Sequence, residues 1–216
     1  MLEKMGEFFD SRLDGYDDHM MTNIEGAGEF YPFTAAQLPR AAGARVVDLG
    51  AGTGLELEEY FKINPKAAVV AIDLAPGMLG ALGHKMAGKD VTLIQGSYFD
   101  VPLGTECFDA AVSVESLHHF TQNEKISLYK KLHGCLLPCG FFILTDYFAT
   151  SDEEEKAFRD ELLRLKAEQG ISGEEFYHYD TPLTVKHEIK ALIAAGFSQI
   201  EELASWGATH TIKAIK

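Results

Sequence analysis

A short glycine-rich segment constrains this chain more than any other part of its sequence. The segment Asp48–Gly54 reads Asp-Leu-Gly-Ala-Gly-Thr-Gly; it follows the run Arg45–Val47 directly and precedes a helical pattern that begins near Leu55. A strand, a tight glycine turn and a helix bring backbone N–H groups and the positive end of the helix against a ligand. Glycine at Gly50 and Gly52 allows that ligand to lie against the backbone, because no Cβ stands in the way.

The glycine spacing argues against a nicotinamide cofactor. A dinucleotide fingerprint, G-x-G-x-x-G, requires its third glycine at position 55, which is Leu55 in this chain. The third glycine is Gly54 instead, so the pattern is D-x-G-x-G-x-G.

Four further segments follow or contain predicted strands. The apolar run 68–72 ends on Asp73, roughly 20 residues past the glycine turn, where a carboxylate can accept both hydroxyls of a ribose. The other three are 91–100, which ends Gln-Gly-Ser-Tyr-Phe-Asp, 108–120, which ends Glu-Ser-Leu-His-His-Phe, and 136–144, Leu-Leu-Pro-Cys-Gly-Phe-Phe-Ile-Leu. The carboxyl ends of parallel strands meet at one edge of a sheet, so we expect Gly50, Asp73, 97–100 and 115–119, which all follow strand ends, to form a single pocket.

In this order the five segments resemble the motifs of the class I S-adenosylmethionine (SAM)-dependent methyltransferases, over roughly residues 45–146. The resemblance implies SAM as the cofactor and an α/β, Rossmann-like fold, with a seven-stranded, mostly parallel sheet, an antiparallel last strand and helices on both faces. It also implies that Asp73 holds the ribose and that hydrophobic residues after it pack on the adenine. The residues expected to contact SAM are Asp48, Gly50, Ala51, Gly52, Asp73, Leu74, Met78, Ser97, Tyr98, Phe99, Asp100, Val114, Glu115, Tyr16 and Tyr31.

The candidate catalytic residues are the two histidines that follow the fourth predicted strand. The sulfonium already activates the methyl carbon, so in-line positioning supplies much of the acceleration, ~7–11 kcal/mol where the orientation is ideal. A general base is needed only when the nucleophile must lose a proton. His118 and His119 are the candidates for that base, since histidine titrates near neutral pH. Alternatively, one of them caps the following turn and the other packs on the methionyl part of SAM.

The two outer parts of the chain are expected to select the acceptor. Residues 1–43 are expected to form a helical cap on a SAM-binding domain of residues 44–216. Residues of about 147–184 are expected to form a lid, and all of these parts belong to one structural domain. Segment 9–17 is similar to the Tyr-Asp segment that many family members fold over the SAM carboxylate, which places Tyr16 there, with Tyr31 nearby. The candidates for acceptor contacts form a polar and aromatic set, as small-molecule sites require: Tyr147, Tyr177, His178 and Trp206.

Local patterns predict the elements of these outer parts. Helical segments are expected around 8–13 and 31–38, separated by Gly26–Gly28, and further helices at about 152–169 and 185–195. Strands at about 199–204 and 209–215 should pair antiparallel across Trp206-Gly207. Pro138 is expected in a helix-to-strand turn before the fifth strand.

Composition limits the compartment and the partners. The 216 residues, 46% of them hydrophobic, suffice for one α/β domain. A net charge of −14 disfavours DNA or structured RNA as a substrate. Three cysteines suit a reducing compartment, and no apolar run is long enough for a membrane helix or a secretion signal, so a cytoplasmic protein is expected.

The sequence therefore predicts a SAM-dependent methyltransferase that acts on an unidentified small molecule, as a monomer or homodimer. No Asp-Asp-Asn arrangement typical of metal-assisted O-methylation can be traced, so no metal is assigned. The Asn-Pro-Pro-Tyr signature of N-methylation is missing where Glu115–Leu117 stands. Two alternatives stay open. The cap, lid and terminal strands also resemble the carboxy-SAM synthases of tRNA wobble modification, which modify SAM itself, and a SAM-binding sensor or partner subunit without turnover is the third hypothesis.

Overall fold

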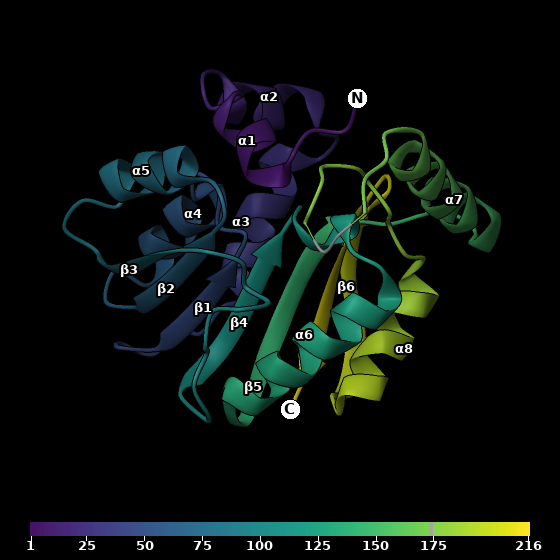
Figure 1. Cartoon of the computed structure of the whole chain (residues 1–216). Helices are drawn as coiled ribbons and strands as arrows, with labels where there is room; N and C mark the ends of the chain where they lie inside the picture. Colours follow the sequence, from purple (N-terminus) through teal and green to yellow (C-terminus); the bar gives the residue numbers. More distant parts are fainter. Residues whose placement is uncertain (173–174) are drawn as a thin grey trace.

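The computed structural model describes residues 1–172 and 175–216 and shows one seven-stranded sheet (Figure 1). The strand order is β3-β2-β1-β4-β5-β7-β6. Strands β1 to β5 are parallel, and β7 runs antiparallel to both of its neighbours, which confirms the predicted fold. The strand bounds are β1 Arg45–Leu49, β2 Ala68–Asp73, β3 Asp90–Gln95, β4 Phe108–Val114, β5 Leu136–Tyr147, β6 Ser198–Trp206 and β7 Thr209–Ile215.

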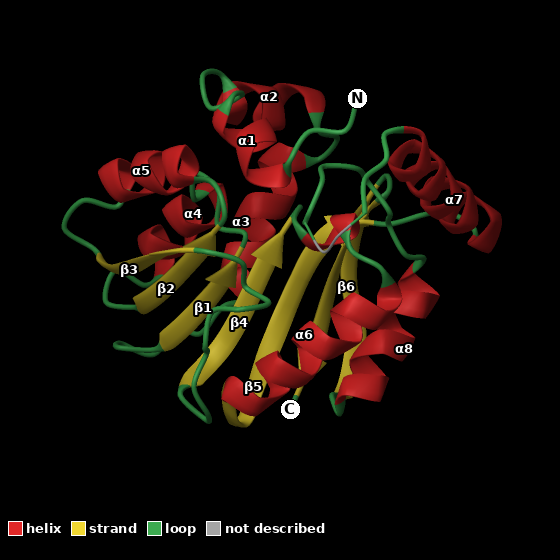
Figure 2. Cartoon of the chain, in the orientation of Figure 1, coloured by secondary structure: helices red, strands yellow, loops and turns green. Residues whose placement is uncertain are grey.

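Helices cover both faces of the sheet (Figure 2). The helices α3 Ala27–Gln37, α4 Leu55–Ile63 and α5 Pro76–Lys85 contribute to one core, against side chains such as Val46 and Val112. On the other face, α6 Gln122–Cys135 and α8 Val185–Ala195 pack over Val47 and Ala111. Because the central strands are buried on both faces, they read as continuous apolar runs rather than as alternating ones.

The N-terminal part contains three helices, not the two that were expected. They are α1 Met5–Asp10, α2 Tyr16–Asn23 and α3. Gly15 and Gly26 lie at the starts of α2 and α3 with φ of 82° and 78°, a left-handed conformation that glycine adopts without strain. Each therefore begins a new helix after a change of direction, and the stretch predicted to separate two helices instead opens α3. Figure 1 shows α1 and α2 above the carboxyl ends of the strands.

The C-terminal elements agree with the sequence to within a residue or two, except at the start of β5. The long helix after β5, α7, spans Asp152–Glu168, and α8 ends at Gly196, which has a left-handed φ of 107°. Pro138 was expected in a helix-to-strand turn; the strand β5 begins earlier, at Leu136, but Cys139 directly after the proline has a left-handed φ of 65°. The chain therefore turns within the first residues of β5, and the pairing of β4 with β5 shifts register between Phe108 and Ala110 at this point.

This topology fixes where a ligand can bind. The strand order reverses between β1 and β4, and ligands of open α/β sheets bind beyond the carboxyl ends of the strands at that point. Within residues 1–172 and 175–216, no helix is long and apolar enough to cross a membrane.

Candidate functional site

Two adjoining cavities lie at the carboxyl edge of the sheet. The smaller holds about 40 Å³ and the larger about 850 Å³. Four residues line both: Phe9, Tyr16, Glu115 and His119. The two cavities therefore share a wall, which we call the junction.

The glycine turn forms the floor of the smaller cavity. Gly50, Gly52 and Gly54 all have left-handed φ values, of 75°, 49° and 80°. A Cβ on Gly52 would meet no atom closer than the Tyr16 hydroxyl, 4.0 Å away, so this backbone is open to a ligand. A Cβ on Gly50 would lie 2.0 Å from Oγ of Ser116. Position 50 therefore requires glycine because the Ser116 side chain packs against it, whether or not a ligand also lies there.

Asp73 occupies the end of β2 beside this turn. Its Oδ2 accepts the N–H of Gly52 and its Oδ1 accepts the N–H of Ala75, both at 2.8 Å. Burial raises the pKa of the carboxyl, while these N–H groups oppose the rise. Each carboxylate oxygen retains a second acceptor position. Asp73 lines the smaller cavity, so a ligand with two hydroxyls could bind to the same carboxylate.

The cap forms the roof of the smaller cavity. Met5, Phe9 and Tyr16 line it from above. Backbone hydrogen bonds tie the cap to the chain after α7: Met5 N donates to Phe176 O, and His178 N to Glu3 O, each at 3.0 Å. The two outer parts of the sequence therefore meet over the carboxyl edge of the sheet.

The larger cavity has a mixed polar and aromatic wall. Parts of segment 8–25 line one side, and the turn between β6 and β7 lines another. His178 stacks on Phe8 with ring centroids 3.4 Å apart, and burial lowers its pKa to about 4. The predicted acceptor contacts that line this cavity are Tyr147, His178 and Trp206. Tyr177 is not among the lining residues, and its hydroxyl donates to Glu175 on the outside at 3.4 Å.

His118 is held by a buried carboxylate. It lies in the short 3-10 helix η1, Leu117–His119, and its Nδ1 is 2.6 Å from Oδ1 of Asp146 in β5. Asp146 also accepts the N–H groups of Leu117 at 2.9 Å and Tyr147 at 3.0 Å. Burial acts to lower the pKa of His118, but Asp146, and then Asp180 and Glu115, raise it to about 9. No motif in the sequence pointed to Asp146.

His119 has different surroundings. Burial, and then the charge of His118, lower its pKa. Its Nδ1 lies 3.2 Å from Oδ1 of Asp180, and its Nε2 is buried without a hydrogen-bond partner among the described residues. Beside it, Glu115 adopts a left-handed φ of 48°, unusual for a residue with a side chain, and burial raises its pKa to about 7. Strain and perturbed titration at one point are typical of functional sites.

Comparison with known proteins identifies the family. A family model described as a methyltransferase domain matches residues 46–140, which contain the glycine turn, Asp73 and the histidine pair. These residues form a class I SAM-dependent methyltransferase domain.

Three relatives illustrate the range of this methyltransferase fold. The carboxy-SAM synthase of Wolinella succinogenes is 29% identical in an alignment covering 95% of this chain and 91% of the relative. A candidate O-methyltransferase from Nostoc punctiforme superposes with a TM-score of 0.72 at 20% identity, covering 99% of this chain and 62% of that chain. Human N-acetylserotonin methyltransferase in complex with SAM superposes with a TM-score of 0.63 at 16% identity, covering 97% of this chain and 55% of that chain.

The methyltransferase residues fit SAM at the smaller cavity. The open backbone of Gly52, the carboxylate of Asp73 and the apolar side chains of Leu74 and Met78 offer what a nucleoside requires. The cavity of about 40 Å³, however, is close to the volume of one water molecule. The smaller cavity alone is therefore too small for a whole SAM molecule, which would also need space from the adjoining larger cavity or a movement of its lining.

Eight of the fifteen residues expected to contact SAM line the smaller cavity: Tyr16, Gly50, Gly52, Asp73, Leu74, Met78, Tyr98 and Glu115. The other seven lie outside its lining: Tyr31, Asp48, Ala51, Ser97, Phe99, Asp100 and Val114. The contacts with SAM stay predictions for all fifteen. Met5 and Ser116 line the cavity without having been singled out. Met5 gave no signal, because a methionine in a short helix reads as ordinary packing.

Asp48 lies deeper than the cavity floor. Both of its carboxylate oxygens are buried without a hydrogen-bond partner among the described residues, and so is Oε1 of Glu56. Burial, and then the neighbouring Glu56, raise the pKa of Asp48 well above its ordinary value, and burial also raises that of Glu56. In this conformation Asp48 is buried beside Glu56 and is not among the residues that line the cavity.

Proposed function

We propose that this protein transfers the methyl group of SAM to a small molecule held in the larger cavity. The proposal rests on the junction, the wall that the two cavities share. Because Phe9, Tyr16, Glu115 and His119 line both cavities, a sulfonium in one and a nucleophile in the other would meet across one wall. In-line displacement needs the reacting atoms about 3–3.5 Å apart, so the two cavities must open into each other between these four residues when both ligands are bound.

The larger cavity supports a small acceptor. Its volume of about 850 Å³ lies within the range of about 300–1,000 Å³ typical of small-molecule sites. The net charge of −14 disfavours a nucleic-acid acceptor. His118 and His119 both line this cavity and remain our catalytic candidates. His119, whose pKa is lowered, is the candidate for the base, whereas His118, with its pKa raised to about 9, would carry a proton near neutral pH. We also propose a reducing, cytoplasmic location, supported by the three free cysteines.

An acceptor assay with a cavity-filling variant tests this function. Methyl-labelled SAM is incubated with metabolite extracts, and S-adenosylhomocysteine and the labelled product are identified by mass spectrometry. Ala208 lines only the larger cavity, so Ala208→Phe should lower product formation at least tenfold and leave the Kd of SAM unchanged. Ala87→Phe, at an exposed position after α5, is the control. Full turnover by Ala208→Phe, or silence of the parent protein across extracts, would contradict the proposal.

A carboxy-SAM synthase is the second candidate, and the Wolinella succinogenes relative is the observation that favours it. Such an enzyme must bring a carboxylate group to the methyl of SAM. The larger cavity is lined by the carboxyls of Glu115 and Asp180 but also by Arg12 and by His118, whose pKa is raised to about 9, so its charge alone does not separate the two candidates. Mass spectrometry of the ligand that copurifies with the protein separates the two, because SAM and carboxy-SAM differ in mass.

A further inference from the structure

Three side chains from two distant segments converge at the wall of the larger cavity. His118 and His119 come from η1, and Asp180 follows α7 in the lid. One ligand atom from each lies within 4.8 Å of the others. We propose that His118, His119 and Asp180 bind a divalent transition-metal ion at this wall.

The spacing of the donor atoms suits such an ion. Oδ1 of Asp180 is 3.6 Å from Nε2 of His118 and 3.2 Å from Nδ1 of His119. Zinc binds histidine nitrogen at about 2.0–2.1 Å and carboxylate oxygen at about 2.0–2.2 Å, so neighbouring ligands of a tetrahedral ion are about 3.3–3.5 Å apart. The two measured separations lie on either side of that value. The two histidine nitrogens lie within 4.8 Å of each other, so an ion would fit once the side chains adjust around it.

The surroundings of His118 match those of a metal ligand. A histidine that binds metal through one ring nitrogen almost always donates the other N–H to a carboxylate or carbonyl. Nδ1 of His118 faces Asp146 at 2.6 Å, which leaves Nε2 free to face Asp180. Asp146 is held by two backbone N–H groups and is fully buried. The tautomer that metal binding requires is therefore set by the fold.

Asp180 supplies the second line of support. Its Oδ1 is buried and lacks a hydrogen bond of good geometry among the described residues, although the side chain as a whole is 42% exposed and two imidazoles lie within 3.6 Å. Buried polar atoms in native proteins are nearly always satisfied, so this oxygen has acceptor capacity left for a cation that it would share with the two histidine nitrogens. The loop is fixed in place, because Thr181 N donates to His118 O at 2.8 Å. A rival arrangement keeps a proton on His119, shared with Tyr179 O at 3.4 Å.

Two histidines and one carboxylate leave coordination positions open, as in catalytic zinc and non-haem iron sites. All three residues line the larger cavity, and His119 also lines the smaller one. An ion here would bind an oxygen or sulfur nucleophile of the acceptor and lower its pKa beside the sulfonium. That role rests on the proposed function, whereas binding of the ion does not. No metal was expected from the sequence, since no Asp-Asp-Asn arrangement could be traced; Asp180 lies about 60 residues after the histidine pair.

Metal binding to tag-free, chelator-treated protein tests the site. Calorimetry with Zn²⁺ alone should give one ion per chain, and Co²⁺ should give the visible absorption of a tetrahedral complex. Asp180→Asn and His118→Asn should each weaken Zn²⁺ binding at least ~100-fold and abolish the Co²⁺ spectrum. His84→Asn, on the exposed side of α5, is the matched control and should change neither.

Asp146→Asn tests the orienting carboxylate. It leaves all three ligands in place and should weaken Zn²⁺ binding ~10–100-fold, the cost typical of losing such a partner. Thermal unfolding reports whether each variant is folded. Absence of Zn²⁺ binding by the folded parent protein, or equal affinity in the parent, Asp180→Asn and His84→Asn, would overturn the proposal in favour of the proton-sharing arrangement. Because neither SAM nor acceptor is present, the result does not depend on whether methyl transfer occurs.

Discussion

Replacing Asp73 by alanine should weaken SAM binding strongly. The carboxylate uses one acceptor position of each oxygen on the N–H groups of Gly52 and Ala75, at 2.8 Å. Its remaining acceptor positions are available to the two hydroxyls of the SAM ribose. Asp73→Ala removes both of these hydrogen bonds together with the charge that accepts them.

The size of the effect follows from the chemistry of the acceptor. A hydrogen bond to a charged group contributes about 1.5–3 kcal/mol, so two contribute about 3–6 kcal/mol. Since 1.4 kcal/mol is a factor of ten in Kd, the full loss corresponds to ~100-fold or more. Water admitted beside the alanine would solvate the ribose hydroxyls and recover part of this binding free energy. We therefore expect the Kd of SAM to increase at least tenfold.

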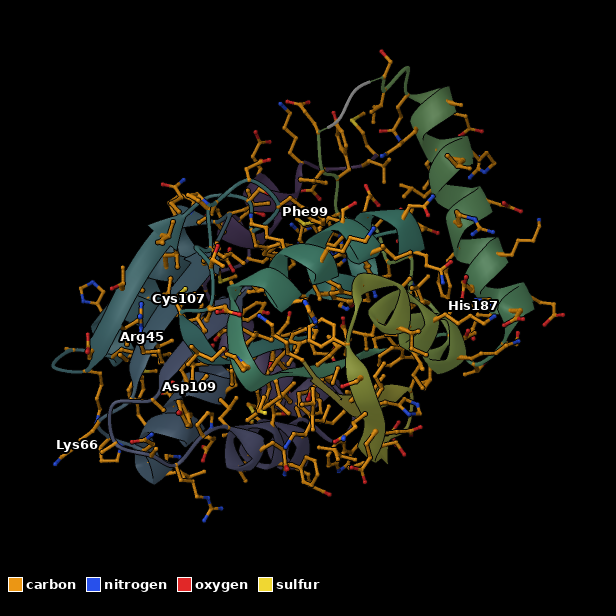
Figure 3. All side chains as sticks on the ribbon, turned by 90° about the horizontal axis from the view of Figure 1, so that it is seen from below. Arg45, Lys66, Phe99, Cys107, Asp109 and His187 are labelled. Atoms are coloured by element: carbon orange, nitrogen blue, oxygen red, sulfur yellow. The ribbon has the colours of Figure 1, made fainter. Side chains whose placement is uncertain are left out.

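Calorimetry with SAM and S-adenosylhomocysteine measures the change, and Asp109→Ala is the matched control. Oδ2 of Asp109 accepts the N–H of Arg45 at 2.8 Å, the same kind of bond at the opposite edge of the sheet, where Figure 3 labels both residues. The control should unfold more easily by ~1 kcal/mol and bind SAM normally. A folded Asp73→Ala protein with a Kd within threefold of the parent would refute the ribose assignment.

Two further predictions concern buried charge. Nζ of Lys125 is 2.6 Å from a carboxylate oxygen of Glu188, which also accepts a hydrogen bond from the hydroxyl of Tyr129. Lys125→Met should therefore lower the free energy of unfolding in urea by about 3–5 kcal/mol, because it leaves a buried charge unpaired, and the double variant with Glu188→Met should recover most of that loss. An equal loss of stability in the single and the double variant would contradict this. Asp48 has a raised pKa in the fold, so its ionisation opposes folding as pH rises above its unfolded pKa of about 4. The stability of Asp48→Asn relative to the parent should therefore increase by more than ~1 kcal/mol from pH 4 to pH 7, and parallel stability curves would exclude the raised pKa.

Local sequence determined the cofactor half of this protein. The glycine spacing of 48–54 and the acid at the end of the next strand are short-range features, since each depends on backbone conformation and strand ends that a few neighbouring residues decide. The alternation of strands and helices then implied the parallel sheet and placed Asp73 and Glu115 at one edge. The outer helices were harder to predict, because Gly15 and Gly26 start helices here, whereas glycine more often ends them.

Only the tertiary structure brought the acceptor side together. Asp146 meets His118 across two parallel strands, and Asp180 meets both histidines only after the chain has passed through α7. Met5 reaches the smaller cavity because the cap folds over the sheet and pairs with the chain before His178. Such contacts join residues far apart in the chain, and no local pattern encodes them. Burial, which sets the pKa values and leaves Oδ1 of Asp180 unpartnered, exists only once the whole sheet, cap and lid have packed.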